Sequence, residues 1–236
     1  MTARFGQVIT AMVTPFDEQG ELDLDAAAEL AQFLVETGSD GLVLSGTTGE
    51  SPALTPSEAS ALFRRVREAV SVPILAGAGS NSTHEALALT REAGVSGVDG
   101  ILSVTPYYNR PSQDGLTEHF TWFDESTDLP VVLFDIRART GRKIETSTIL
   151  RLAREVDNIV GVKDAAGDLV ETAGLMAEAP DGFELYWCDD ALTLPLLSVV
   201  VVGVLSRASH LAAYRFADSN ESLHKGVVET ARSVNE

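Results

Sequence analysis

Lys163 is the residue whose type and setting most favour covalent chemistry. It closes the run Asn158-Ile159-Val160-Gly161-Val162-Lys163, whose apolar and small residues are typical of a strand buried on both faces. Because burial disfavours an ammonium ion, we expect the pKa of the Lys163 amine to fall. A neutral amine is a nucleophile suited to Schiff-base formation with a carbonyl substrate. Taken alone, the run also fits a lysine that extends to solvent from a strand end.

A second segment combines hydroxyl side chains with two glycines. It reads Ser45-Gly46-Thr47-Thr48-Gly49 and follows an apolar run. Glycine lets the backbone approach a ligand closely, and backbone N–H groups with threonine hydroxyls are good donors to a small carboxylate. The segment therefore predicts a carboxylate cradle around Thr47 and Thr48. It also fits an ordinary glycine-rich turn before the next helix.

Aromatic and cationic side chains follow two later apolar runs. Tyr107 and Tyr108 stand between two prolines, a rigid pair that fits either a proton relay or aromatic packing at a loop. Arg137, Arg139 and Arg142 follow the next run. A guanidinium fork among them would suit a second carboxylate, and plain surface charge is the alternative for Arg137 and Arg142.

These segments can form one site only if helices and strands bring them to the same edge of a sheet. Short apolar runs alternate with amphipathic stretches, which predicts strands at residues 8–13, 41–44, 74–76, 100–102, 131–134, 159–162, 183–186 and 201–205, and helices at residues 24–36, 56–70, 83–93, 113–122, 147–154, 168–177, 191–199 and 209–218. This alternation predicts a parallel sheet closed into a (β/α)8 TIM barrel, with its chemistry at the carboxyl ends of the strands. An open doubly wound sheet is the alternative, but its first strand would run into a glycine-rich phosphate turn rather than Thr14-Pro15-Phe16. We expect one domain over residues 1–236, with a short helical tail from about 219.

Composition narrows the class of protein. The 236 residues carry a net charge of -18, which argues against nucleic acid and anionic membrane surfaces as partners. The single cysteine, Cys188, and the lack of a signal-peptide pattern favour the cytoplasm. Four histidines without ligand spacing predict no metal site, and we expect no cofactor.

Together the segments resemble the dihydrodipicolinate synthase and N-acetylneuraminate lyase family, closest to its dihydrodipicolinate synthase branch. The match rests on Gly46-Thr47-Thr48-Gly49-Glu50, Thr105-Pro106-Tyr107-Tyr108, Arg139-Thr140-Gly141 and Gly161-Val162-Lys163, in this order. The resemblance covers about Phe5 to His210. It implies a class I lyase on a (β/α)8 barrel that condenses pyruvate with aspartate semialdehyde in lysine biosynthesis.

The same resemblance implies site residues. As catalytic residues it implies Lys163, which would form the imine with pyruvate, and Thr47 and Tyr108, which would belong to a proton relay. Two threonines, Thr47 and Thr48, would hold the pyruvate carboxylate, and Arg139 would bind the carboxylate of the aldehyde. In all, the implied substrate-binding positions are Gly46, Thr48, Arg139 and Val204.

Several positions depart from the family pattern. Phe134 stands where the family has a tyrosine that transfers protons, so the condensation is expected to be slowed by roughly 10²–10⁴-fold. Arg137 and Ala138 replace the usual residues of the next loop, Trp187 is expected to bring an indole to the barrel mouth, and Arg207 stands where a small or apolar residue is usual. Most of the helical extension that follows the barrel in the family is missing.

These departures leave three interpretations of function. The first is a pyruvate-dependent synthase impaired by Phe134. The second is an engineered or reshaped barrel that keeps Lys163 for retro-aldol or other amine catalysis on a larger carbonyl substrate. The third is a catalytically silent scaffold. The expected partners are small keto acids and aldehydes, and a monomer or homodimer is expected in place of the family tetramer.

Overall fold

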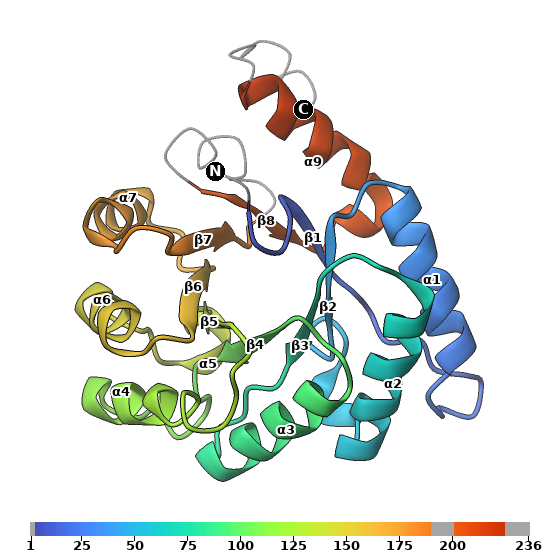
Figure 1. Cartoon of the computed structure of the whole chain (residues 1–236), viewed down its shortest axis with the longest axis horizontal. Helices are drawn as coiled ribbons and strands as arrows, with labels where there is room; N and C mark the ends of the chain where they lie inside the picture. Colours follow the sequence, from blue (N-terminus) through green and yellow to red (C-terminus); the bar gives the residue numbers. More distant parts are fainter. Residues whose placement is uncertain (1–2, 190–200, 225–236) are drawn as a thin grey trace.

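The chain folds into a closed barrel of parallel strands, which confirms the predicted (β/α)8 architecture. The computed structural model describes residues 3–189 and 201–224, and Figure 1 shows the strands at the centre of the molecule. The strands pair in sequence order, and β8 returns to pair with β1. They are β1 (Val8–Ala11), β2 (Gly41–Leu44), β3 (Ile74–Gly77), β4 (Gly100–Val104), β5 (Val131–Asp135), β6 (Ile159–Asp164), β7 (Glu184–Trp187) and β8 (Gly203–Ser206).

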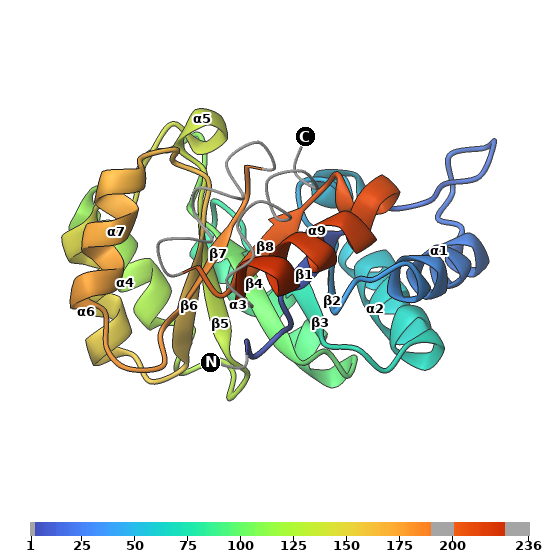
Figure 2. The same cartoon turned by 90° about the horizontal axis from the view of Figure 1, so that it is seen from above.

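Helices surround the barrel and cover the outer face of the strands (Figure 1). They are α1 (Leu24–Glu36), α2 (Pro56–Ala69), α3 (Thr83–Val95), α4 (Gln113–Thr121), α5 (Arg137–Thr140), α6 (Thr146–Glu155), α7 (Leu169–Glu178) and α9 (Ser209–His224), with a 3₁₀ turn η1 (Ser51–Ala53). Short α5 differs from the others because it lies at the upper rim of the molecule in Figure 2, above the strands. Among the described helices, none is long and apolar enough to cross a membrane.

Two predicted helix starts show how local sequence fixes the elements. At α2, Thr55 and Glu58 form a complete capping box, in which each side chain accepts a hydrogen bond from the other residue's backbone N–H. At α3 the box is half formed. Ser82 accepts from the Glu85 N–H, whereas the Glu85 carboxylate accepts from the Ser80 hydroxyl instead.

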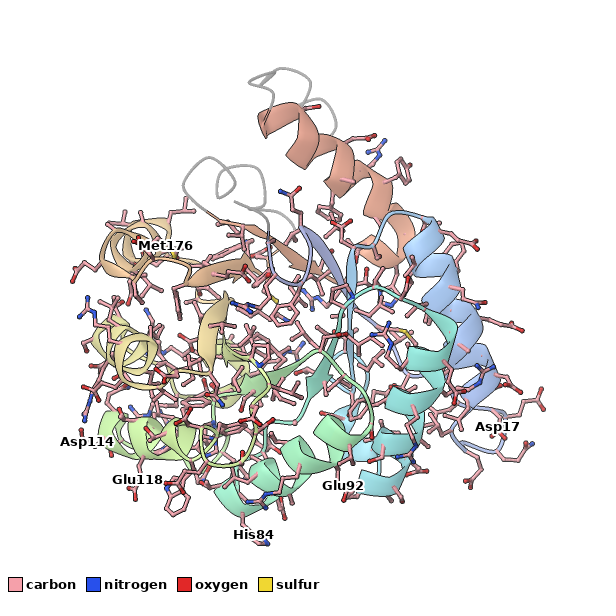
Figure 3. All side chains as sticks on the ribbon, viewed as in Figure 1. Asp17, His84, Glu92, Asp114, Glu118 and Met176 are labelled. Atoms are coloured by element: carbon pink, nitrogen blue, oxygen red, sulfur yellow. The ribbon has the colours of Figure 1, made fainter. Side chains whose placement is uncertain are left out.

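Apolar side chains alternate between an inner and an outer core along each strand. In β5, Val132 and Phe134 belong to the cluster inside the barrel, whereas Val131 and Leu133 pack outward against the helices. Charged helix positions such as Asp114 and Glu118 lie at the outer rim of the helical layer (Figure 3). The inner cluster thus closes the barrel below its carboxyl end and leaves that end to polar loops.

The observed elements differ from the predicted ones mainly at their ends. Strand β6 runs on through Lys163 to Asp164, so the lysine lies within the strand ladder. Neither α5 nor η1 was predicted, because both are short turns without a helical apolar period. The predicted helix at 191–199 and the end of the predicted tail lie outside the described residues.

Candidate active site

A cavity of about 520 Å³ lies at the carboxyl end of the barrel. Its floor is made by inward side chains of the strands, and its rim by residues of the loops that follow them. The described lining residues are Ala11, Val43, Ser45, Gly46, Thr47, Thr48, Ser51, Gly77, Gly79, Leu102, Val104, Phe134, Ile136, Ala138, Arg139, Lys163, Ala165, Cys188, Asp189 and Arg207. Five of the predicted site residues therefore line one cavity. They are Gly46, Thr47, Thr48, Arg139 and Lys163.

Lys163 is the buried cation of this cavity. Its exposed fraction is 5%, and in the sheet register it stands opposite Phe134 on β5. The Lys163 Nζ lies 4.0 Å from the centroid of the Phe134 ring. Burial disfavours a charged nitrogen, whereas the face of an aromatic ring attracts one. The Phe134 ring thus gives the buried amine a face suited to a cation.

Tyr186 stands on the other side of Lys163 but points its hydroxyl away. The two residues pair across β6 and β7. The Tyr186 hydroxyl donates to the Glu184 carboxylate at 2.8 Å and accepts from the Phe5 N–H at the amino end of the barrel. Burial and the nearby Glu184 raise the pKa of Tyr186. Tyr186 cannot supply the hydroxyl that Phe134 lacks, and no tyrosine is among the described residues that line the cavity.

The turn after β2 holds Thr47 and Thr48 in place. Ser45 and Glu50, on either side of them, both have left-handed backbones with φ of 53°. The Ser45 carbonyl packs so closely on Gly77 that a Cβ there would lie 2.3 Å from it, so only glycine fits. Among the described residues, the backbone N–H groups and hydroxyls of Thr47 and Thr48 donate no hydrogen bond. These donors are therefore available to a carboxylate.

Arg139 lies on α5, and hydrogen bonds with the loop after β4 hold the end of this helix in place. The Arg110 Nε donates to the Gly141 carbonyl at 3.1 Å, and the Arg142 Nη2 donates to the Arg110 carbonyl at 3.2 Å. The Thr140 hydroxyl closes the turn on the Arg142 carbonyl. Of the three arginines that the sequence placed here, only Arg139 lines the cavity.

Three sequence-predicted residues do not reach the cavity. Tyr108 is 89% exposed on a left-handed turn with φ of 72°. Val204 faces the opposite way from the cavity, because it packs with Val8 and Ala213 on the outer side of the barrel. Its neighbour Leu205 is the β8 residue that joins the inner cluster. The expectation for Trp187 was wrong: its indole is buried in the outer core and donates to the Asp189 carbonyl at 2.7 Å.

A buried carboxyl pair behind the lysine was missed by the sequence analysis. Asp135 and Asp164 follow Phe134 and Lys163 on the paired strands, and both face outward. Burial and the neighbouring Asp164 raise the pKa of Asp135 to about 7, and burial also raises the pKa of Asp164. Asp164 accepts from the Ala166 N–H and the Thr172 hydroxyl, which ties the end of β6 to α7. The alternation of strand faces could have located this pair. Among the described residues no cluster of ligating side chains fits a metal ion.

The fold and this cavity define a class of protein. A (β/α)8 barrel with a buried lysine near the carboxyl end of β6 is a class I, lysine-dependent lyase of the aldolase type. The particular family follows from comparison with known sequences. The chain belongs to the dihydrodipicolinate synthetase family, whose sequence model matches residues 4–236.

Individual relatives are similar over nearly the whole chain. The 4-hydroxy-tetrahydrodipicolinate synthase of Moorella thermoacetica is 47% identical over 98% of this chain and 80% of that protein. The crystal structure of a dihydrodipicolinate synthase from Bacillus anthracis superposes with a TM-score of 0.96 at 40% identity, over 100% of this chain and 80% of that one. The enzyme from Cyanidioschyzon merolae, solved with lysine bound, gives 0.95 at 44% identity, over 98% and 80%. This chain spans about four fifths of the length of these relatives.

Proposed function

We propose that this protein condenses pyruvate with aspartate semialdehyde to give 4-hydroxy-tetrahydrodipicolinate, a step of lysine biosynthesis. The observation that carries the proposal is Lys163, buried at one wall of a cavity whose opposite rim holds the donors of Thr47 and Thr48. The similarity to enzymes of that name supports the same assignment.

The geometry supports a division of labour among these residues. The Lys163 amine adds to the C2 carbonyl of pyruvate and water leaves, which gives an iminium ion. The Phe134 ring, 4.0 Å from Nζ, favours that positive charge. Thr47 and Thr48 hold the pyruvate carboxylate. Loss of a C3 proton then gives an enamine that attacks the aldehyde carbon.

Arg139 orients the second substrate. The proton transfers of the reaction need a hydroxyl group. The Arg139 guanidinium at the rim suits the carboxylate of aspartate semialdehyde. The amino group of that substrate then displaces Lys163 from C2, which closes the ring and frees the lysine. With phenylalanine at position 134, proton transfer rests on the Thr47 hydroxyl, on water and on Tyr108 of a second copy of the chain, so the condensation is slowed.

In this proposal Tyr108 takes part in the proton relay from a second copy of the chain. Its side chain is exposed and does not line the cavity of its own barrel. A homodimer would bury it, because large aromatic side chains are favoured at the centre of interfaces. The chain's single cysteine fits a reducing compartment, and we place the enzyme in the cytoplasm.

A condensation assay tests the proposed function. Pyruvate-dependent loss of aspartate semialdehyde should be measurable for the wild-type protein and absent in Lys163→Ala. Arg139→Gln should raise the KM for the semialdehyde more than the KM for pyruvate. Arg137→Gln, whose side chain is exposed and outside the cavity, serves as the matched control. Condensation that survives in Lys163→Ala would refute the proposal.

A reshaped cavity with another carbonyl substrate is the second candidate. Three departures from the family pattern line the cavity: Phe134, Ala138 and Arg207. Arg137 and Trp187 do not. Lys163-dependent retro-aldol cleavage of a larger 2-oxo acid, without any condensation of aspartate semialdehyde, would favour it.

A further inference from the structure

Arg207 adds a third cationic side chain to the active-site cavity. It follows β8, is exposed, and lines the cavity together with Lys163 and Arg139. Asp189 is the one acidic side chain among the described lining residues. Within the described residues Arg207 makes no ion pair. In a chain of net charge -18, this excess of positive charge at one cavity favours anionic ligands there.

The backbone at Arg207 is held from both sides. The Ser209 N–H donates to the Ser206 hydroxyl at 3.0 Å, and the Ser209 hydroxyl donates to the Ser206 carbonyl at 3.1 Å. His210 Nδ1 lies 2.8 Å from the Arg207 carbonyl, and its Nε2 accepts from the Val13 N–H at 3.2 Å. These bonds tie the turn between β8 and α9 to the chain after β1. The backbone position from which the Arg207 side chain extends is thus set before a ligand binds.

The order of strands places Arg207 apart from the two carboxylate sites already described. A keto acid joined to Lys163 on β6, with its carboxylate at Thr47 and Thr48 after β2, crosses the barrel mouth. Arg139 follows β5 and lies on one side of that line, whereas Arg207 follows β8 and lies on the other. An aldehyde held by Arg139 therefore leaves Arg207 without a partner.

We propose that Arg207 binds a second carboxylate on the keto acid, so that the cavity accepts 2-oxo dicarboxylic acids as well as pyruvate. The inference rests on the proposed imine chemistry at Lys163 and changes only what is bound there. The imine forms as before: Nζ bonds to C2 and the carbonyl oxygen leaves as water. A guanidinium–carboxylate pair joined by charge-assisted hydrogen bonds supplies the added affinity.

Borohydride trapping with two five-carbon acids tests this inference. The probes are 2-oxoglutarate and 2-oxopentanoate, which have the same chain length and differ by one carboxylate. In the wild-type protein, half-maximal trapping should need about tenfold less 2-oxoglutarate than 2-oxopentanoate, the effect of one charge-assisted hydrogen-bonded pair. In Arg207→Gln the two concentrations should become similar. Arg137→Gln, an exposed arginine outside the cavity, should keep the wild-type ratio.

Three outcomes would overturn the inference, and they differ from failure of the proposed function. If pyruvate gives an adduct and 2-oxoglutarate gives none, or if Arg207→Gln keeps the preference, then Arg207 does not bind the second carboxylate. The third outcome is that condensation with a dicarboxylic aldehyde depends on Arg207 while trapping of the dicarboxylic keto acid does not. In that case Arg207 binds a carboxylate of the aldehyde, and the proposal is wrong. If no keto acid is trapped, the proposed function and the inference fall together.

Discussion

Lys163 and Phe134 form the chemical centre of the molecule at the scale of single residues. The ring that contacts the amine favours the charged imine, yet it cannot give or take a proton. In the proposed mechanism the two effects act on different steps: the ring assists formation of the iminium, and the missing hydroxyl slows the proton transfers around it. A single oxygen atom should therefore change the rate more than the affinity.

Restoring that oxygen is the residue-scale prediction. Phe134→Tyr should raise kcat for condensation at least about tenfold, within the usual range for a general acid–base group. The ring is buried and lines the cavity, so a hydroxyl on it would reach the reacting atoms. Steady-state kinetics with both substrates checks this. Phe134→Leu is the control, which should lose the cation–π contact and gain nothing. An unchanged kcat in Phe134→Tyr would show that proton transfer at this position does not limit the reaction.

Whether the sequence could predict that a residue lines the cavity depended on which face of its strand the residue occupies. That Lys163, Thr47, Thr48 and Arg139 line one cavity could be predicted, because they follow apolar runs and the carboxyl ends of barrel strands meet at one rim. Val204 and Trp187 were misplaced because each lies one residue from an inward position, and a shift of one reverses the face. The exposure of Tyr108 depends on a left-handed turn that sequence pattern does not reveal.

At the scale of elements, a buried pair of aspartates on the outer face of β5 and β6 links pH to stability. Asp135 on β5 stands beside Asp164 on β6, and its Oδ1 has no hydrogen-bond partner among the described residues. Facing Asp135 are the Asp164 carboxyl, the Ile144 N–H that donates to it, and the Lys143–Glu171 ion pair. With Lys143 paired to Glu171, charge on Asp135 is poorly compensated.

Stability should therefore fall as pH rises. The folded-state pKa of Asp135, about 7, lies above its unfolded value near 3.8, so the folded state binds the proton more tightly. The stabilisation is complete below about pH 4 and is lost as pH rises to 7. Between pH 5 and pH 8, the wild-type free energy of unfolding should fall by about 3 kcal/mol relative to Asp135→Asn, which cannot ionise.

Urea unfolding at the two pH values measures this difference. Asp181→Asn is the matched control, because that aspartate is exposed in the turn before β7 and should leave the wild-type pH dependence intact. Equal pH dependence in Asp135→Asn and the wild-type protein would show that Asp135 is already ionised in the folded state at pH 5.

At the scale of the whole molecule, the fold was predictable because every unit repeats one pattern. Alternating apolar runs and capped amphipathic stretches determine the closed barrel, and no long-range detail was needed. Alternation along each strand indicates that Asp135 and Asp164 face outward. The register that places them side by side was not predictable in the same way.

Assembly is the prediction at this scale. We expect one or two chains of 25.1 kDa in solution, because a net charge of -18 opposes larger assemblies at low salt. Light scattering after size exclusion measures the mass. Tyr108→Ala should shift a dimer towards the monomer, whereas Leu211→Ala, equally exposed on α9, should not. A mass near four chains would contradict the expectation.

The covalent adduct at Lys163 tests the central claim most directly. Incubation with millimolar pyruvate and borohydride, followed by mass spectrometry, should show one reduced adduct on the intact chain, and peptide mapping should place it on Lys163. The adduct should be absent in Lys163→Ala and present in the control Lys143→Ala, whose lysine pairs with Glu171 outside the cavity. An intact chain without any adduct, or an adduct that persists in Lys163→Ala, would contradict the account.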